Sequence, residues 1–344
     1  MRAPRVRVRA RGRRRGRRSW GRRRLQCRHG LPPVRDVSAA PALRLPLRLL
    51  APWHWPAWLG LGLVWLIGRL PWRLALPAGA ALGTALRPLM TARRRIARRN
   101  LALCFPDLPA AEREALLRAH FADLGRMLAE FALSWMASDR AFARIPCRLR
   151  GLEHLAAVQA KGRGALLVGG HFSHLELCAR LVAQQVPLAG LYREHGSPVF
   201  EWAVKRRRLR YAQAMFGRRE LRATVRHLRA GGTLWYAPDQ DMRGKDSVFA
   251  PFFGVQASTI TATHHLARLS GAAVLPFSHR RLPGSAGYEL QIGAPLADFP
   301  SADEVADTGR VNTAIEAMVR AAPEQYLWIH KRFKTRPAGE PGVY

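Results

Sequence analysis

The sequence predicts an α/β fold in which helices pack on a central sheet. Two observations carry this prediction: short apolar runs recur beyond Pro146, and segments of helical spacing separate them. Such alternation is typical of a sheet whose strands are joined by helices. No internal repeat, G-x-S-x-G elbow, Walker loop or Rossmann loop is found. The apolar runs are ALLVG at 165–169, PLAGLY at 187–192, TLWYA at 233–237 and AVLPFS at 273–278, and the helical segments lie near 174–185, 198–230, 259–270 and 303–321.

A long amphipathic helix is expected before this region, over residues 110–136. Pro109 precedes it at a position that suits a first helical turn. The apolar positions at helical spacing are Leu116, Leu117, Phe121, Leu124, Leu128, Phe131 and Trp135.

The charge of the 344-residue chain is extreme, with a formal net charge of +34. Arginine occupies 13 of the first 24 positions, and no acidic residue precedes Asp36. We therefore expect residues 1–42 to be a disordered tail, or the product of a start codon assigned too far upstream. An RNA-binding arm is the alternative, but the tail lacks the interleaved aromatic residues that stack on bases. Four irregularly spaced cysteines, Cys27, Cys104, Cys147 and Cys178, indicate a reducing compartment.

Residues 43–76 are predicted to anchor the chain to a membrane. The run from Ala51 to Trp72 is almost entirely apolar and holds five of the ten tryptophans, a residue that prefers the membrane interface. Its length is close to the roughly 20 residues of a spanning helix, although Pro56 also allows an interfacial anchor. A buried core helix is the remaining alternative. Arginines between Arg87 and Arg99 place residues 77–344 in the cytoplasm by the positive-inside rule.

A polar cluster follows the first apolar run, in GGHFSHLELC at 169–178. Ser173 and Glu176 have the spacing of a capping box that starts a helix. His171, just before the cap, is expected to fold back toward Glu176, and a carboxylate on one imidazole nitrogen makes the other a better base. Zinc bound by His171 and His174, with His264 or His265 as third ligand, is a competing interpretation without an H-E-x-x-H motif to support it. His174 is otherwise expected to be solvated or packed.

Several blocks of the sequence resemble one enzyme family. H171-F-S-H-L-E176 is similar to the H-x4-D/E motif of glycerolipid-type acyltransferases, and the surrounding blocks resemble, in order, the late acyltransferases of lipid A biosynthesis, most closely the lauroyl transferase type. The resemblance covers residue 45 or so to the C-terminus. Its blocks are RRNLALCFPDL at 98–108, LYREHGSP at 191–198, WYAPDQD at 235–241, SVFAPFFGV at 247–255, ARLSGAAVLPF at 267–277 and PEQYLWIHKRFKTRP at 323–337.

The resemblance implies a fold, a reaction and a location. The fold would be a glycerolipid-acyltransferase-like αβα sandwich with a mixed central sheet. An anchor helix would precede it at the inner membrane, and the catalytic domain would face the cytoplasm. The enzyme would transfer a fatty acyl chain from acyl-carrier protein to a hydroxyl of a β-hydroxyacyl chain on a Kdo-bearing lipid A precursor. Inner-membrane phospholipid would be a further partner, and no nucleic acid, cofactor or metal is expected. An enzyme that takes acyl-CoA and acylates a lysophospholipid or another glycolipid is the alternative.

Four residues are expected to form the site. His171 would deprotonate the acceptor hydroxyl and Glu176 would orient His171, while Arg193, after the PLAGLY run, is the candidate partner of the oxyanion. Asp239 follows another strand end, where it is expected to bind acceptor hydroxyls or hold Arg193. A role in an Asx turn, and the neighbouring Asp241, compete with that assignment.

The basic segment KRRRLR at 205–210 is a candidate docking site for the donor or the acceptor. A solvated helix face is its alternative.

Overall fold

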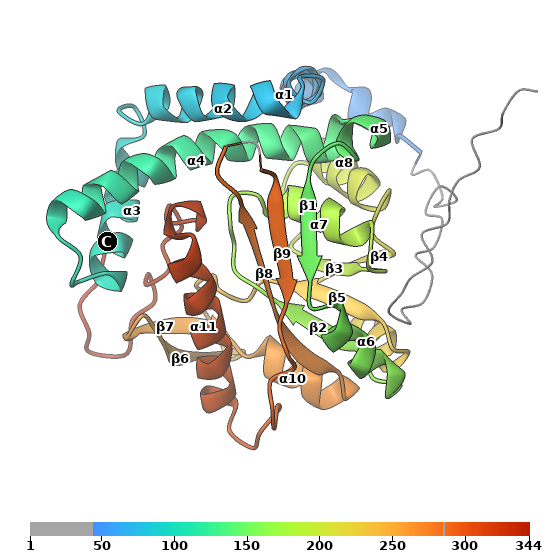
Figure 1. Ribbon diagram of the computed structural model, residues 1–344, viewed down its shortest axis with the longest axis vertical. Helices are drawn as coiled ribbons and strands as arrows, with labels where there is room; N and C mark the ends of the chain where they lie inside the picture. Colours follow the sequence, from blue (N-terminus) through green and yellow to red (C-terminus); the bar gives the residue numbers. More distant parts are fainter. Residues whose placement is uncertain (1–43, 285) are drawn as a thin grey trace, which may run out of the picture.

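The computed structural model describes residues 44–284 and 286–344, so the arginine-rich stretch 1–42 lies outside the described residues. A seven-stranded sheet forms the centre of the molecule, with the strand order β1-β9-β8-β2-β5-β3-β4 (Figure 1). The strands are β1 (Cys147–Arg150), β2 (Ala165–Val168), β3 (Ala189–Tyr192), β4 (Ala214–Gly217), β5 (Thr233–Tyr236), β8 (Ala273–Arg281) and β9 (Tyr288–Ile292).

The sheet is mixed, as predicted. All its pairings are parallel except that between β8 and β9. The four predicted apolar runs became β2, β3, β5 and β8, and β2 lies between β5 and β8. A separate hairpin is formed by β6 (Ser247–Phe252) and β7 (Val255–Ile260), and its Phe252 is fully buried in the core.

Helices cover both faces of the sheet, because alternate residues of each strand point to opposite sides. Leu166 and Val168 of β2 belong to a core shared with α10 (Ala262–Ser270) and α11 (Glu304–Ala321). Ala165 and Leu167 of the same strand belong to a second core, shared with α6 (Leu152–Ala160) and α7 (Leu175–Ala183). The predicted layering of helix, sheet and helix is therefore formed.

The predicted helix over 198–230 is not continuous. It consists of α8 (Pro198–Arg208), the edge strand β4 and α9 (Leu221–Arg229). Residues 214–217 pair with β3 in parallel register, and the N–H of Gln213 donates to the carbonyl of Leu188 at 2.7 Å. Pairing with a neighbouring strand thus overrides the local helical pattern. Strands β1, β6, β7 and β9, which are short or half exposed, were also absent from the sequence prediction.

The predicted long helix is present as α4 (Ala110–Met136), and two helices before it replace a single anchor helix. The apolar run divides into α1 (Trp55–Ile67) and α2 (Trp72–Leu86), after the short 3-10 turns Leu47–Leu50 and Pro52–His54, and α3 (Thr91–Cys104) follows. Pro71 caps α2 after a turn that begins at Gly68. Within the described residues, no helix combines the length and the apolar character needed to cross a membrane. The boundary predicted between residues 76 and 77 falls inside α2.

Helices α2 and α4 lie against each other along the top of the molecule (Figure 1). Three glycines allow this contact: a Cβ added to Gly125 would lie 1.9 Å from the carbonyl oxygen of Gly79, and one added to Gly83 would lie 2.2 Å from that of Phe121. The two backbones therefore touch with no side chain between them.

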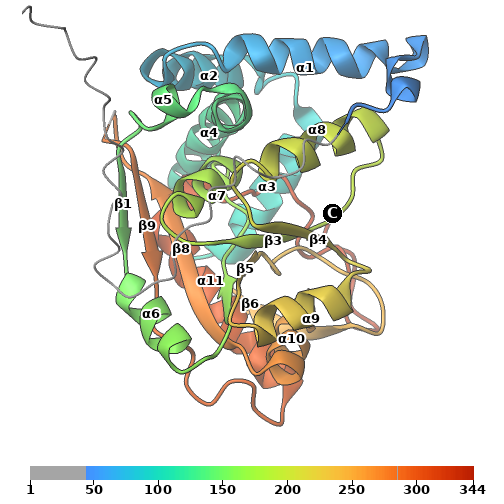
Figure 2. The ribbon, with the colours of Figure 1, turned by 90° about the vertical axis from the view of Figure 1, so that its right-hand side faces the viewer.

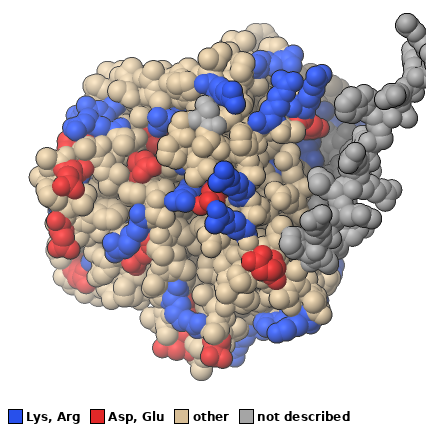
Figure 3. Space-filling model, in the orientation of Figure 1, with Lys and Arg blue, Asp and Glu red and all other residues tan. Residues whose placement is uncertain are grey.

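Helices α1 and α2 and the turn between them expose many large apolar side chains to solvent. Leu59 is 76% exposed and Leu74 61% exposed, whereas α4 beneath them supplies core residues. In Figure 3, tan surface covers much of the area over α2, and blue lysine or arginine side chains lie to either side of it. We call this surface the α1–α2 apolar face; it comprises Trp55, Leu59, Leu63, Trp65, Leu66, Leu70, Leu74 and Leu82.

Candidate active site

His171 lies at the carboxyl edge of the sheet, two glycines beyond the end of β2. Asp239 lies at the same edge, because β5 runs beside β2 in parallel register and ends at Tyr236. The carboxyl ends of parallel strands are where open α/β sheets bind ligands. Strand order thus brings together two residues that are 68 positions apart in the sequence.

The two residues form a tight pair. The imidazole Nδ1 lies 2.5 Å from Oδ1 of Asp239, and the backbone N–H of His171 donates to Oδ2 at 2.9 Å. The side chain of Asp239 is 1% exposed and that of His171 is 30% exposed. With Nδ1–H donating to the carboxylate, the lone pair of Nε2 is left to accept a proton. The pair has the geometry of a general base with its orienting carboxylate.

The carboxylate of Asp239 is held in its charged form. Burial alone would raise its pKa, but the charge and hydrogen bonds of His171 and the hydroxyl of Tyr326 lower that pKa well below its usual value. The Tyr326 hydroxyl donates to Oδ2 at 2.8 Å. Asp239 therefore remains an acceptor for Nδ1–H throughout the neutral pH range.

The segment 325–327 holds the His171 loop from the other side. The N–H of Leu327 donates to the carbonyl of His171 at 3.0 Å, and the N–H of Ser173 donates to the carbonyl of Gln325 at 2.9 Å. Phe172 and Tyr326 form an antiparallel bridge between these bonds. The backbone around His171 is thus fixed by a segment more than 150 residues away. No local pattern in 169–178 indicates this contact, although Tyr326 lies inside the block 323–337 that the sequence singled out.

Glu176 does not contact His171, so the expected histidine–glutamate pair is wrong in its geometry. Its carboxylate accepts hydrogen bonds from Arg208 (2.6 Å), Trp135 (2.8 Å) and Tyr211 (3.0 Å). Burial would raise the pKa of Glu176, but Arg208 and these donors lower it. Because Glu176 lies on the first turn of α7 and His171 before it, the two side chains diverge. The carboxylate instead ties α7 to α4 and α8.

The expected capping box is also absent. His174 occupies the N-cap position of α7, without a side-chain cap bond. The Ser173 hydroxyl donates to the buried carboxylate of Asp123 on α4, a residue that the sequence did not single out. Ser173 and Glu176, the two side chains that the local pattern assigned to the cap, are thus both hydrogen-bonded to other parts of the fold.

Arg193 and Asp241 also lie at this edge of the sheet, but Arg193 is exposed whereas Asp241 is hydrogen-bonded. Arg193 directly follows β3 and is exposed, and within the described part of the chain it forms no ion pair. Asp239 does not hold it, because that carboxylate is occupied by His171 and Tyr326. The carboxylate of Asp241 accepts bonds from the N–H and hydroxyl of Thr335, both at 2.9 Å, and so has a structural role.

The segment 205–210 divides between inward and outward side chains. Arg208 reaches Glu176, and the Arg206 guanidinium lies 5.0 Å from the ring centre of Trp202. Both expectations for this segment treated it as surface, and Arg208 contradicts them because its guanidinium satisfies a buried carboxylate.

The histidines expected as zinc ligands are dispersed. His264 pairs with Asp307 and His265 with Glu304. His174 is fully buried, with Nε2 3.1 Å from the carbonyl of His279, and burial lowers its pKa to about 4. In the part of the chain that the structure describes, the group with ligand spacing is His174, Cys178 and His279, which does not include His171.

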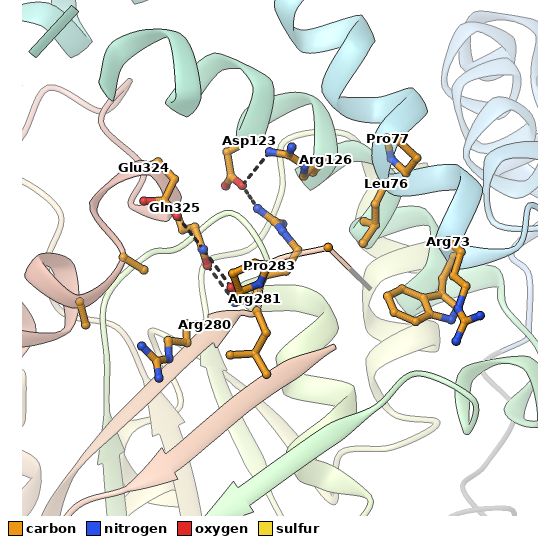
Figure 4. A pocket seen from close by; sticks show the side chains of 15 residues that line it. Arg73, Leu76, Pro77, Asp123, Arg126, Arg280, Arg281, Pro283, Glu324 and Gln325 are labelled. Atoms are coloured by element: carbon orange, nitrogen blue, oxygen red, sulfur yellow. Dashed lines mark hydrogen bonds and ion pairs between the residues drawn. The ribbon is translucent and has the colours of Figure 1, made fainter. Parts of the chain in front are cut away.

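A cavity of about 590 Å³ lies behind the His171 loop, between α2, α4 and the end of β8. In Figure 4, Arg281 reaches Asp123, and the side-chain amide of Gln325 bonds the backbone of Arg281. Trp72, Leu76 and Pro77 form its wall on the α2 side. His171 does not line this cavity. The cavity is lined in part by Gln325, whose backbone carbonyl accepts a hydrogen bond from Ser173 in the His171 loop.

Known proteins resemble the chain over most of its length. The family model described as bacterial lipid A biosynthesis acyltransferase matches residues 46–335. The lipid A biosynthesis lauroyltransferase of Escherichia coli K12 is 41% identical over 86% of this chain and 97% of its own length. The palmitoleoyltransferase of the same organism is 40% identical over 88% and 99%.

A solved structure, the 1-acyl-sn-glycerophosphate acyltransferase of Thermotoga maritima, aligns with 68% of this chain and 99% of its own. Its sequence identity is 17% and its TM-score 0.34. The family match and the relatives at 40% identity and above agree with the resemblance in the sequence. The chain belongs to the bacterial lipid A biosynthesis acyltransferases.

Proposed function

We propose that this acyltransferase moves a fatty acyl chain from acyl-carrier protein to a hydroxyl of a β-hydroxyacyl chain on a Kdo-bearing lipid A precursor, with His171 as general base. The observation that carries the mechanism is the His171–Asp239 pair, whose free Nε2 belongs to a half-buried imidazole at the carboxyl edge of the sheet. Membership of the family supports acyl transfer onto lipid A.

The proposed reaction needs no covalent acyl-enzyme. Nε2 of His171 takes the proton of the acceptor hydroxyl while the hydroxyl oxygen attacks the thioester carbonyl of the donor. The tetrahedral intermediate collapses, the C–S bond breaks, and the imidazolium returns its proton to the departing thiolate. Asp239 keeps Nδ1 protonated throughout and stabilises the transient imidazolium.

The proposed partner of the tetrahedral oxyanion is Arg193. It follows β3, which is the neighbour of β5 on the side away from β2, so it lies two strands from His171 at the same edge. A guanidinium that forms no ion pair in the described part of the chain has its donors available to a developing negative charge. Glu176 is assigned a positioning role, since its contacts hold α7 rather than the imidazole.

The α1–α2 apolar face is proposed to lie in the cytoplasmic leaflet of the inner membrane. Exposed leucines and tryptophans supply apolar area and interfacial anchors. Arg69 lies in the turn between the helices and Arg73 in the first turn of α2, where their charges can meet anionic phospholipid headgroups. The lipid acceptor would then reach the site from this side of the molecule.

Mass spectrometry of lipid A tests the proposal in cells that lack the chain and then regain it. Cells with the wild type are expected to recover the missing acyl chain, and cells with His171→Ala are expected not to. His265→Ala is the matched control, because His265 is an exposed histidine on α10 that pairs with Glu304 and lies edge to face with the ring of His264. Full acylation by His171→Ala would contradict the mechanism.

The donor is tested separately with purified enzyme. We expect transfer from acyl-carrier protein to exceed transfer from acyl-CoA at equal acyl chain and concentration. A preference for acyl-CoA, together with acylation of a lysophospholipid, would replace the proposed substrates by the alternative ones and leave the base unchanged.

A further inference from the structure

Helix α9 presents a stripe of arginines to solvent. Arg222, Arg226 and Arg229 follow one another at four and three residues, so they share one face of the helix. All three are exposed, as are Arg218 and Arg219 in the turn before the helix. Leu221 lies beside them and is 48% exposed. We call this surface, residues 218, 219, 221, 222, 226 and 229, the α9 basic stripe.

The charge of the stripe is not neutralised within the described residues. None of Arg218, Arg219, Arg222 and Arg226 forms an ion pair there. Glu220, the acidic residue among them, uses its carboxylate to accept the N–H of Gly217 at 2.7 Å. The positive charge is therefore available to a partner outside the chain.

The opposite face of α9 fixes the stripe rigidly to the sheet. Thr224 and Leu228 are buried, and Leu228 belongs to the same core as Leu166 and Leu234 of the sheet. The helix packs on β4, β5 and α10. A rigid surface loses little conformational entropy when it binds a partner.

The stripe begins at the edge of the sheet that carries His171. Strands β2, β5, β3 and β4 are parallel neighbours, so their carboxyl ends share one edge, and β4 leads into α9 through residues 218–220. Nη2 of Arg218 lies 3.0 Å from the sulfur of Met242, three residues beyond Asp239. A ligand docked on α9 thus has a short path to the His171–Asp239 pair.

The stripe also lies away from the α1–α2 apolar face. In Figure 2, α1 and α2 run along the top of the molecule and α9 lies in its lower half, beside α10. If the protein binds the membrane through α1 and α2, α9 remains accessible to soluble molecules. This separation favours a soluble protein partner over an anionic lipid surface as the occupant of the stripe.

We infer that the α9 basic stripe docks the acidic carrier protein that delivers the acyl thioester, with Leu221 as the apolar contact within a positively charged surface. The inference rests on the proposed function, which names an acyl-carrier protein as donor. The arginines steer and orient the acidic partner, and the carrier's flexible thioester arm reaches over the turn at 218–220 to the carboxyl edge.

The test is the double charge reversal Arg222→Glu with Arg226→Glu, assayed at low salt. We expect KM for the acyl-carrier substrate to rise roughly tenfold or more, with kcat at saturation within about twofold of the wild type. Arg148→Glu with Lys161→Glu is the matched control: it changes the charge equally at exposed residues of β1 and the end of α6. The control is expected to keep the wild-type KM.

Acyl-pantetheine, a small uncharged donor, provides a second readout. The double reversal is expected to use it as well as the wild type does, which shows that the site is still folded. Charge reversal of acidic residues on the carrier is expected to lower the raised KM of the α9 variant part of the way to the wild-type value. It is not expected to lower the KM of the wild type or of the control.

Three results would overturn the inference. An unchanged KM for the carrier in the double reversal contradicts docking on α9 while leaving the donor assignment intact. Reduced flotation with anionic vesicles at an unchanged KM assigns the stripe to the membrane instead. Absence of transfer from the carrier by the wild type rejects the proposed donor, and the docking inference with it.

Discussion

The residue that defines the site chemically is Asp239, because it determines what His171 can do. A buried carboxylate that accepts both the ring N–H and the backbone N–H of one histidine fixes the orientation and the tautomer of that ring. Tyr326 supports the same carboxylate from the far C-terminal part of the chain. Glu176, which is closer in sequence, has a different set of partners and hence a different role.

Asp239→Asn is expected to lower kcat by about 10²- to 10⁴-fold, because an amide NH₂ directed at Nδ1 favours the tautomer with the proton on Nε2. KM for both substrates is expected to change little. The measurement is steady-state kinetics on the purified variant, with Asp241→Asn as control because that carboxylate bonds Thr335 instead. Equal losses of kcat in the two variants would contradict a special role for Asp239.

Glu176→Gln is expected to lower the free energy of unfolding by about 3–5 kcal/mol at pH 7, because Arg208 loses its buried counter-charge. Catalysis by the folded fraction is expected to persist. Denaturant unfolding measures the loss, and Glu153→Gln on the exposed face of α6 is the control. A stable but inactive Glu176→Gln would restore the direct catalytic role that the sequence suggested.

The pH dependence of that loss has a definite sign. The pKa of Glu176 is lower in the folded chain than its usual value of about 4.3. Its contribution to stability is therefore fully present above that value and disappears as the pH falls through the folded-state pKa. The difference between wild type and Glu176→Gln should be constant from pH 7 to pH 5.5 and shrink below about pH 4.

At the scale of elements, the contact between α2 and α4 determines how the apolar N-terminal run is arranged. Backbone touches backbone at Gly79, Gly83 and Gly125. Gly68, at the end of α1, is similarly close to the carbonyl of Ala132 on α4, at 2.6 Å from an added Cβ. These contacts place two helices against α4 where hydropathy alone suggests one helix in a bilayer.

Gly125→Ala is expected to destabilise the protein by about 1–3 kcal/mol, because its methyl group meets the backbone of α2 and the helices must separate. A glycine-to-alanine change in an open helix has the opposite sign, a gain of about 0.5–1 kcal/mol. Gly60→Ala on α1 is that control, since nothing lies within 4 Å of its added Cβ. Thermal unfolding distinguishes the two, and a gain in both would show that α2 and α4 are not in close contact.

At the scale of the whole molecule, two surfaces face different substrates in this proposal. The α1–α2 apolar face would meet the membrane, from which the lipid acceptor comes, and the α9 basic stripe would meet the soluble donor. The carboxyl edge of the sheet, with His171 and Asp239, would receive both substrates.

Leu66→Ser and Leu74→Ser are each expected to weaken vesicle binding roughly tenfold, because each removes a leucine that is about 60% exposed from contact with the membrane. Vesicle flotation at fixed lipid concentration is the measurement. Leu269→Ser is the control, since Leu269 is also exposed but lies on α10. If all three variants lose the same affinity, the α1–α2 apolar face is not the binding surface.

The central strands and the long helix α4 could be predicted from the sequence, which also singled out His171, the proposed base. Buried strands and amphipathic helices are encoded by the spacing of neighbouring side chains, and so β2, β5 and α4 follow from local pattern. The family also follows from the sequence, because its blocks occur in order along the chain.

Which carboxylate contacts His171 depends on the tertiary structure. Asp239 reaches the imidazole because β5 lies beside β2, and strand order depends on how the whole sheet buries its two faces. Glu176, five residues from His171, is directed away from it by its hydrogen bonds to Arg208, at the end of α8, and to Tyr211, in the turn that follows. The local pattern had joined α8 to β4 in a single helix. Contacts of this range depend on the summed burial of many residues, which no short stretch of sequence contains.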